Sequence, residues 1–257
     1  MRADLFLCST GQAKSRTQAQ EMIKLGTVYC GGTAVTKPSW PVPDGETLTV
    51  TGYEKKYVSR AGLKLEAALD RFGINAEGRT ALDIGASTGG FTDCLLSRGA
   101  ARVYAVDVGH GQLDGKLASD PRVVSMEGVN ARELSSSIKI FAADIVTMDV
   151  SFISQTLIIP EIVPFCSGST VFVSLIKPQF ESGKENVGRG GIVRDPVAHR
   201  NAVGRVMECA AREGFFPVGA MRSPIPGGDG NTEFLAAFSF GRQGTPDMDG
   251  IYREVGL

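Results

Sequence analysis

The sequence predicts an α/β fold with a mostly parallel sheet, preceded by a small α+β domain. From residue 79 onward, short apolar runs that suit strands alternate with longer runs that suit helices, which is typical of a parallel sheet with helices on both faces. Residues 1–52 instead show short helical patterns followed by short strand patterns, and residues 53–58 form a linker between the two regions. A chain of 257 residues has room for one small and one medium domain.

The first region begins with helical patterns. Ser15 can cap a helix whose apolar residues recur at helical spacing, and Gly26 can end it. Residues 27–30 then alternate like a strand, a glycine pair at 31–32 marks a tight turn, and residues 48–50 form another strand. We therefore expect a compact helix-and-hairpin unit.

The second region spans residues 59–244 and is followed by a C-terminal tail, residues 245–257. Ser59 can cap its first helix, which runs to Phe72. The expected strands are residues 81–84, 103–107, 123–126, 145–149, 171–176, 215–220 and 233–239. The clearest later helices are residues 91–98, 156–163 and 197–213. The glycine-rich stretch 181–191 is expected to be a mobile loop.

Charge is distributed unevenly along the chain. The formal net charge is −1, which argues against a uniformly basic coat, yet residues 1–60 hold eight Lys and Arg residues and five acids. Such asymmetry is a weak indication that the N-terminal part meets a polyanion such as RNA. The residues expected to contact RNA phosphates are Arg2, Lys14, Arg16, Lys24 and Arg60.

Cysteine use and hydropathy exclude several protein classes. The five cysteines are scattered and none forms a C-x-x-C pair, so neither a metal site nor a disulfide framework is expected. The first residues contain no signal-peptide core, and the apolar runs fall far short of the ~20 residues that span a bilayer. We therefore expect a soluble, cytoplasmic protein.

The run from residue 81 to residue 91 carries the strongest chemical signal. An apolar strand passes through Gly85, Ser87, Gly89 and Gly90 into a helix, and glycines at such a turn let the backbone turn tightly and a ligand approach the helix closely. The spacing matches neither a P-loop nor the G-x-G-x-x-G pattern. Asp83, at the strand end, suits the amino group and sulfonium of S-adenosylmethionine, whereas it would repel a pyrophosphate.

A second acid supports this interpretation. Asp107 ends the next strand, where an acid can bind ribose hydroxyls, and Asn130 follows the third strand, where adenine contacts are expected. The alternative is a glycine-rich turn that serves only packing. The residues expected to hold the cofactor are Asp83, Gly85, Ser87, Gly89, Gly90, Asp107, Asn130 and Asp149.

Four further charged residues point to methyl transfer onto a sugar hydroxyl. Asp149 and Lys177 end two strands, so in a parallel sheet both reach the carboxyl edge, and Glu233 reaches it too if its strand runs antiparallel. A ribose hydroxyl is a weak acid and needs a positioned base. Lys177 can serve as that base if Lys64 acts as a second cation that favours its neutral form. The alternative is a set of unrelated surface charges.

With these motifs the chain resembles the TlyA family, labelled haemolysins and understood as rRNA 2′-O-methyltransferases. The strings that carry the resemblance are residues 2–7, 15–19, 37–39, 57–62, 149–154 and 194–196. The first region resembles an S4-type RNA-binding domain. The remainder is similar to FtsJ-like class I Rossmann methyltransferases, which implies a seven-stranded, mostly parallel sheet. The catalytic tetrad of that family falls on Lys64, Asp149, Lys177 and Glu233, with Lys177 implied as the base.

The resemblance implies that the substrate is a cytidine ribose in ribosomal RNA, within assembled or assembling subunits, with no membrane and no obligate protein partner. Two other functions compete. A membrane-active haemolysin would require an amphipathic or membrane-spanning segment, and the sequence offers no convincing one. An inactive RNA-binding protein is disfavoured because the acids and lysines expected to bind and react are intact.

Overall fold

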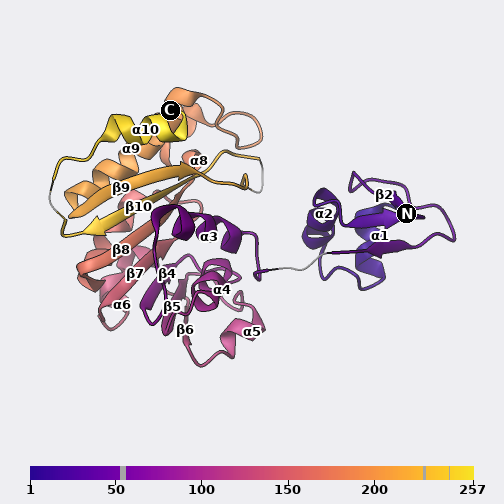
Figure 1. The fold of residues 1–257 in the computed structure, drawn as a ribbon, viewed down its shortest axis with the longest axis horizontal. Helices are drawn as coiled ribbons and strands as arrows, with labels where there is room; N and C mark the ends of the chain where they lie inside the picture. Colours follow the sequence, from indigo (N-terminus) through magenta and orange to yellow (C-terminus); the bar gives the residue numbers. More distant parts are fainter. Residues whose placement is uncertain (53–55, 228–229, 243) are drawn as a thin grey trace. The chain divides into compact units, whose positions relative to one another are not determined.

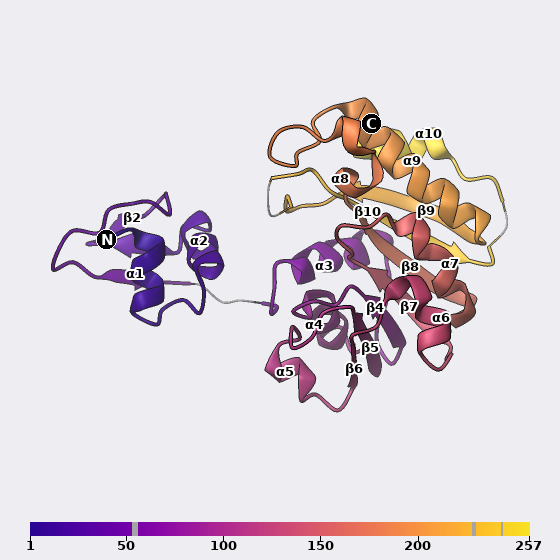
Figure 2. The ribbon, with the colours of Figure 1, turned by 180° about the vertical axis from the view of Figure 1, so that it is seen from behind.

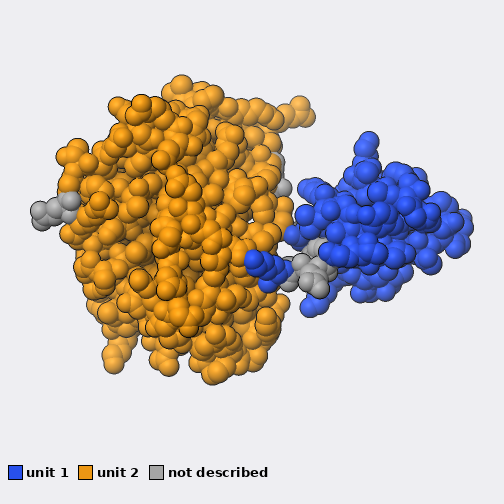
Figure 3. Space-filling view, viewed as in Figure 1, with its two compact units in different colours: residues 1–56 blue, residues 57–257 orange. Residues whose placement is uncertain are grey.

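The computed structural model describes residues 1–52, 56–227, 230–242 and 244–257. The chain divides into two compact units, Met1–Lys56 and Tyr57–Leu257, which are coloured separately in Figure 3. Of the predicted linker, residues 53–55 lie outside the described residues. Tyr57 belongs to the second unit, because its ring is buried against Gly62 and its hydroxyl donates a hydrogen bond to Glu66.

The first unit contains two helices and a three-stranded antiparallel sheet. Ser15 caps the second helix by accepting a hydrogen bond from the Gln18 amide, as predicted. Gly26 follows that helix in the left-handed conformation, which glycine adopts without steric cost. The sheet order is β2-β1-β3. The elements are α1 (Ala3–Ser9), α2 (Arg16–Lys24), β1 (Val28–Cys30), β2 (Thr33–Ala34) and β3 (Leu48–Val50).

The second unit is built on a seven-stranded sheet, which confirms the predicted fold class. The strand order is β6-β5-β4-β7-β8-β10-β9. The first five are parallel, whereas β10 is antiparallel to both β8 and β9. The strands are β4 (Thr80–Ile84), β5 (Arg102–Asp107), β6 (Val123–Glu127), β7 (Ala143–Met148), β8 (Cys166–Ile176), β9 (Phe215–Arg222) and β10 (Phe234–Phe240).

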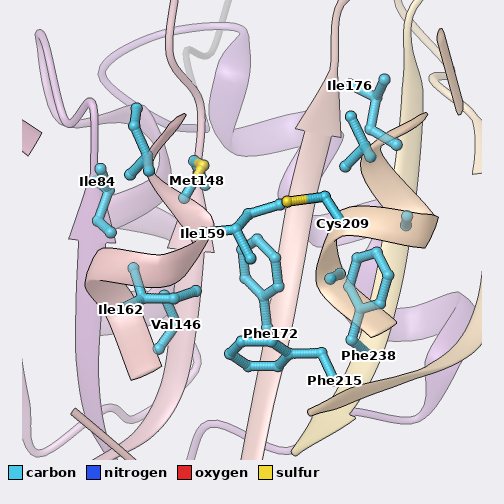
Figure 4. Close-up of a cluster of buried hydrophobic side chains, with 14 of the residues drawn as sticks. Ile84, Val146, Met148, Ile159, Ile162, Phe172, Ile176, Cys209, Phe215 and Phe238 are labelled. Carbon is cyan, nitrogen blue, oxygen red and sulfur yellow. The ribbon is translucent and has the colours of Figure 1, made fainter. Parts of the chain in front are cut away.

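Helices cover both faces of this sheet (Figures 1 and 2). On one face lie α3 (Ala61–Phe72), α4 (Gly90–Ser97) and α5 (Gly115–Ala118). On the other lie α6 (Leu134–Ser137), α7 (Ile159–Ile162), α9 (Pro196–Arg212) and α10 (Met248–Val255). A separate apolar core fills each interface. Figure 4 shows part of the core on the α9 side of the sheet, where Phe172, Phe215 and Phe238 pack together. The two cores fix the strand ends from which the site is built.

Several predicted elements differ in the structure. The helix α3 begins after Arg60 and has no side-chain cap, so Ser59 is not its N-cap. The predicted tail contains α10, whose Ile251 and Val255 are buried in the core. The expected helix 156–163 is divided into 3₁₀ turns and the short α7. Among the described residues, no helix combines the length and hydropathy needed to cross a membrane.

Candidate active site

The four residues of the predicted tetrad meet at the carboxyl edge of the sheet. Asp149 directly follows β7 and Lys177 directly follows β8. Glu233 directly precedes β10, whose first residue, Phe234, pairs with Ile176 at the end of β8. The antiparallel direction of β10 therefore brings Glu233 to the same edge. Lys64 reaches this edge from α3.

Two ion pairs join these four side chains. The Lys177 ammonium lies 2.6 Å from Asp149 Oδ1 and donates a hydrogen bond of 2.9 Å to the Ser151 hydroxyl. The Lys64 ammonium lies 2.5 Å from Glu233 Oε2, and these two side chains are only 10% and 3% exposed. Each lysine therefore has its own carboxylate. The expectation that Lys64 favours the neutral form of Lys177 stays a prediction.

Three adjoining cavities open along this edge. The large cavity has about 570 Å³ and is lined by Asp107, Asn130 and Asp149, among others. The loop cavity, about 300 Å³, runs along residues 85–90 and includes Lys64 and Lys177. The outer cavity, about 270 Å³, is lined by Lys177, Glu233, Phe152 and Phe180 among others. Asp149 is shared by the first two cavities and Lys177 by the last two. These volumes suit a small ligand beside a reacting group.

Asp107 and its neighbours line the large cavity. The Asp107 carboxylate accepts hydrogen bonds from the backbone amides of Ser87, at 2.8 Å, and Gly109, at 2.7 Å. Ser87 adopts a positive φ of 48°, which is uncommon for a non-glycine residue. The Asn130 carbonyl oxygen accepts a hydrogen bond from the Arg132 amide. A carboxylate offers about four acceptor positions, so Asp107 can still accept hydrogen bonds from a ligand.

Asp83 lies beneath the site and lines none of these three cavities. Its side chain is fully buried, and its two oxygens accept hydrogen bonds from Thr92, at 2.6 Å, and Thr147, at 2.8 Å. Burial raises the pKa of this carboxyl to about 6, against the lowering effect of the two hydrogen bonds. The expected direct contact between Asp83 and a ligand is therefore not what the structure shows. Asp83 instead joins α4 to β7.

The glycines of the loop lie close to other parts of the protein. A side chain at Gly89 would collide with Leu117 and Leu113, and one at Gly90 would collide with Ser59. Gly85, with φ of 79°, lies against the backbone carbonyl of Asp149. The expectation that Gly89 and Gly90 let a ligand approach the helix closely stays a prediction. Gly85 and Gly90 still line the loop cavity.

Sequence reasoning missed a set of residues that join the segment after Asp149 to the segment after Lys177. Glu181 ends the short helix α8 (Pro178–Glu181) and is 1% exposed. Its carboxylate accepts hydrogen bonds from the Ser154 hydroxyl, at 2.6 Å, and the Gln155 amide, at 2.8 Å. Burial raises the pKa of Glu181, although these bonds oppose the effect. The predicted mobile loop 181–191 is therefore anchored at its first residue.

The rings of Phe152 and Phe180 line the outer cavity together with Lys177. Phe152 is 92% exposed and has a positive φ of 65°, a genuine outlier for a bulky residue. Its ring lies 5.2 Å from that of Phe180. One local signal points to this region, because Ser151 and Phe152 directly follow Asp149 at the strand end. Strained, exposed aromatic residues at such a place are candidates for ligand contact.

The predicted RNA-contacting residues fall in both units. Arg2 and Arg16 both bind the buried carboxylate of Asp4, at 3.0 Å and 3.2 Å. Lys14 and Lys24 are exposed on the same unit. Arg60 lies in the second unit, where it lines the loop cavity.

Comparison with known proteins identifies both units. Residues 57–240 match the FtsJ-like methyltransferase family, and residues 1–48 match the S4 domain. The fold also resembles that of Aeropyrum pernix fibrillarin solved with S-adenosyl-L-methionine, with a TM-score of 0.52 over 82% of this chain and 94% of that one, at 13% identity. That likeness concerns the fold alone.

Closer relatives cover nearly the whole chain. Hemolysin A of Brachyspira hyodysenteriae is 45% identical over 93% of this chain and 99% of its own length. The 16S/23S rRNA (cytidine-2'-O)-methyltransferase TlyA of Mycobacterium tuberculosis is 46% identical over 91% of this chain and 88% of its own. A Streptococcus thermophilus protein solved as a candidate hemolysin has a TM-score of 0.77 and 39% identity, over 98% of this chain and 94% of that one. The chain therefore belongs to the TlyA family of FtsJ-like methyltransferases, with an S4 domain at its N-terminus.

Proposed function

We propose that this protein transfers a methyl group from S-adenosylmethionine to the 2′-hydroxyl of a cytidine ribose in ribosomal RNA. The observation that carries the proposal is the Lys177–Asp149 ion pair, at 2.6 Å, placed where the loop cavity meets the outer cavity. A base held at that junction lies between a bound cofactor and an entering ribose. The relatives named as rRNA (cytidine-2'-O)-methyltransferases provide the substrate class.

The residues of the large cavity and the loop cavity fit S-adenosylmethionine. Asp107 would accept hydrogen bonds from the ribose hydroxyls, and apolar residues such as Val108 and Val129 would contact the adenine. The side-chain oxygen of Asn130 already accepts a hydrogen bond from the Arg132 amide. The side-chain nitrogen of Asn130 would therefore face the adenine as a donor. The backbone of residues 85–90 would hold the methionine part. Asp83 would act as a positioning residue through Thr92 and Thr147.

The chemistry requires removal of one proton from a weakly acidic hydroxyl. When bound, S-adenosylmethionine supplies an electrophilic methyl group on a sulfonium sulfur. Lys177, in its neutral form, would accept the 2′-hydroxyl proton as the ribose oxygen attacks that methyl group. Asp149 and Ser151 hold the lysine nitrogen in place. The Lys64–Glu233 pair would close the other side of the ribose site.

The outer cavity would receive the target nucleotide. A nucleotide whose ribose reaches Lys177 must leave its stack, and enzymes commonly support such a base on aromatic side chains. Phe152, backed by Phe180, provides an exposed ring beside Lys177. The S4 domain, through Arg2, Lys14, Arg16 and Lys24, would bind phosphates elsewhere on the same RNA. We infer a cytoplasmic location from this ribosomal substrate.

The direct test is methyl transfer from labelled S-adenosylmethionine to unmodified ribosomal subunits, with small and large subunits assayed separately. Digestion of the labelled RNA to nucleosides should yield 2′-O-methylcytidine. Label on a base, or no transfer to either subunit by a protein that binds the cofactor, would refute the proposal. Mapping of the labelled position would then identify the nucleotide.

A further inference from the structure

A fourth cavity lies at the same edge of the sheet, next to the outer cavity. It has about 350 Å³, and its lining includes Arg194, Arg222, His199 and Thr232. Thr232 directly precedes Glu233, which lines the outer cavity. We name this fourth cavity the arginine cavity. None of its residues belongs to the cofactor site or to the tetrad.

The register of the sheet fixes how far this cavity lies from the reacting lysine. Arg222 ends β9 and pairs with Phe234 of β10, while the Ser223 amide donates a hydrogen bond of 2.8 Å to the Glu233 carbonyl. Because β10 lies between β9 and β8, the backbone at Arg222 is two strand spacings from the end of β8, about 10 Å. Lys177 stands at that end of β8.

The walls of the arginine cavity are held by buried polar groups. The side chain of Asn231, which is 1% exposed, accepts a hydrogen bond from the Val193 amide and donates one to the Gly191 carbonyl. A ring nitrogen of His199 lies 3.0 Å from the Val193 carbonyl oxygen. These bonds tie the segment before α9 to the segment before β10. The cavity is therefore a formed feature of the fold.

The two arginines are available to bind an anion. Both are exposed, and in the part of the chain that the structure describes neither guanidinium has an ion-pair partner. The Asp195 carboxylate, next to Arg194 in the chain, caps α9 by accepting a hydrogen bond from the Val197 amide. A third arginine, Arg200, donates a hydrogen bond to Leu257, which also lines the cavity.

We propose that the arginine cavity binds a backbone phosphodiester of the substrate RNA, close to the nucleotide whose ribose lies at Lys177. The inference rests on the proposed function. Guanidinium groups match the geometry of phosphate oxygens and can donate two parallel hydrogen bonds. An RNA strand that lies along this sheet edge passes Glu233 before it reaches Arg222, so one phosphate next to the target falls on Arg194 and Arg222.

The test is a salt series of equilibrium binding to unmodified ribosomal subunits, with the full chain. Replacing both arginines (Arg194→Gln with Arg222→Gln) should make the slope of log K against log salt shallower by about 1. The matched control replaces Arg79 and Arg102 by Gln. These residues lie at the amino ends of β4 and β5, at the opposite edge of the sheet, and their loss should leave the slope unchanged. Calorimetry with S-adenosylmethionine should give equal affinity in all variants, which verifies folding.

The outcomes of these measurements decide the proposal. A slope change no larger than that of the control pair overturns the proposal. Inorganic phosphate can also be titrated calorimetrically into the wild type and into the Arg194→Gln, Arg222→Gln variant. If only the wild type binds phosphate but the RNA salt slope is the same in both, the proposal is overturned, because the cavity then serves a small anion. Replacing both arginines by Lys keeps the charge and should keep the slope. If the subunits bind with the arginine-dependent slope but receive no methyl group, the proposed function fails while the phosphate site stands.

Discussion

The Lys177 ammonium lies 2.6 Å from the Asp149 carboxylate across the adjacent ends of β8 and β7. If this lysine takes the 2′-hydroxyl proton, Lys177→Ala should lower the single-turnover rate by ~10²–10⁴-fold while the cofactor and RNA still bind. Lys177→Arg should fail as well, because a guanidinium stays protonated at any working pH. Single-turnover methylation of ribosomal subunits across a pH series measures both effects. A near-normal rate with Lys177→Arg would reduce the lysine to an electrostatic anchor.

The buried Lys64–Glu233 pair predicts separate effects on stability and on activity. Lys64→Met leaves the Glu233 carboxylate buried without its cation, which should cost about 3–5 kcal/mol of unfolding free energy. Replacing both residues (Lys64→Met with Glu233→Leu) should recover most of that loss, since neither charge remains, while methyl transfer stays absent. Urea denaturation and the transfer assay measure the two quantities.

The control for this prediction is the exposed ion pair between Arg71 and Glu254, whose side chains are 52% and 51% exposed. Arg71→Met should change the unfolding free energy by less than about 1 kcal/mol. If Lys64→Met is no more damaging than Arg71→Met, the Lys64–Glu233 pair does not carry the stability that its burial implies.

Asp83 should give the stability of the second unit a distinct pH dependence. The pKa of Asp83 is about 6 in the folded protein, whereas the ordinary value for an aspartate, which applies to the unfolded chain, is 3.8. Between these values the unfolded chain releases its proton while the folded chain retains it, so this group lowers stability as the pH rises from about 4 to 6. The full effect is about 3 kcal/mol above pH 6. Asp83→Asn should remove it.

The measurement is the difference in unfolding free energy between wild type and Asp83→Asn at pH 4 and pH 7. The variant should gain about 2 kcal/mol relative to wild type over that interval, because part of the effect is already present at pH 4. A difference that is constant with pH would show that Asp83 titrates normally. Thr147→Val serves as a companion, because it removes a hydrogen bond that holds the pKa of Asp83 down and should steepen the pH dependence.

The sequence predicts the place of the site better than its internal contacts. Asp107, Asp149 and Lys177 could be placed because parallel strands carry their carboxyl ends to one edge. The position of Glu233 depended on the direction of β10. The sequence left that direction open, and the sheet register shows that β10 runs antiparallel to β8. These residues follow directly from local patterns and one rule of topology.

Contacts between distant segments could not be predicted in this way. The burial of Asp83 depends on Thr92 and Thr147, which come from two other elements. The collision of a Gly89 side chain with Leu117 depends on how α5 packs. The α10 helix, assigned to a tail, is stabilised by burial of Ile251 and Val255 against the core. Tertiary packing decides each of these features, and no local pattern encodes it.

The buried Glu181 should act as a positioning residue for both catalytic segments. It lies four residues after Lys177 and binds Ser154 and Gln155, which follow Asp149 by five and six residues. Glu181→Gln keeps the shape but replaces an acceptor oxygen by a donor, so the two segments should shift. We expect kcat to fall about 10- to 100-fold with little change in KM for the RNA.

Glu185→Gln is the matched control, because Glu185 is exposed and lies four residues further along the chain, in a separate 3₁₀ turn. Steady-state kinetics of both variants give the comparison. Equal losses in kcat for the two variants, or a loss in thermal stability without a kinetic effect, would show that Glu181 serves the fold alone.

The S4 domain should contribute two classes of cation to RNA binding. Arg2 and Arg16 share the buried Asp4 carboxylate, and although burial opposes its ionisation, their hydrogen bonds and that of Gln20 hold the pKa of Asp4 at about 2. Because Asp4 offsets part of their charge, Arg2 and Arg16 should release fewer counterions on binding than the exposed Lys14 and Lys24.

The pair Lys14→Gln with Lys24→Gln should therefore reduce the salt slope more than Arg2→Gln with Arg16→Gln. Salt titrations with the same ribosomal subunits compare the two pairs directly. Equal reductions would show that Asp4 releases both arginines when RNA binds, and no reduction from either pair would place the RNA surface on another part of the molecule.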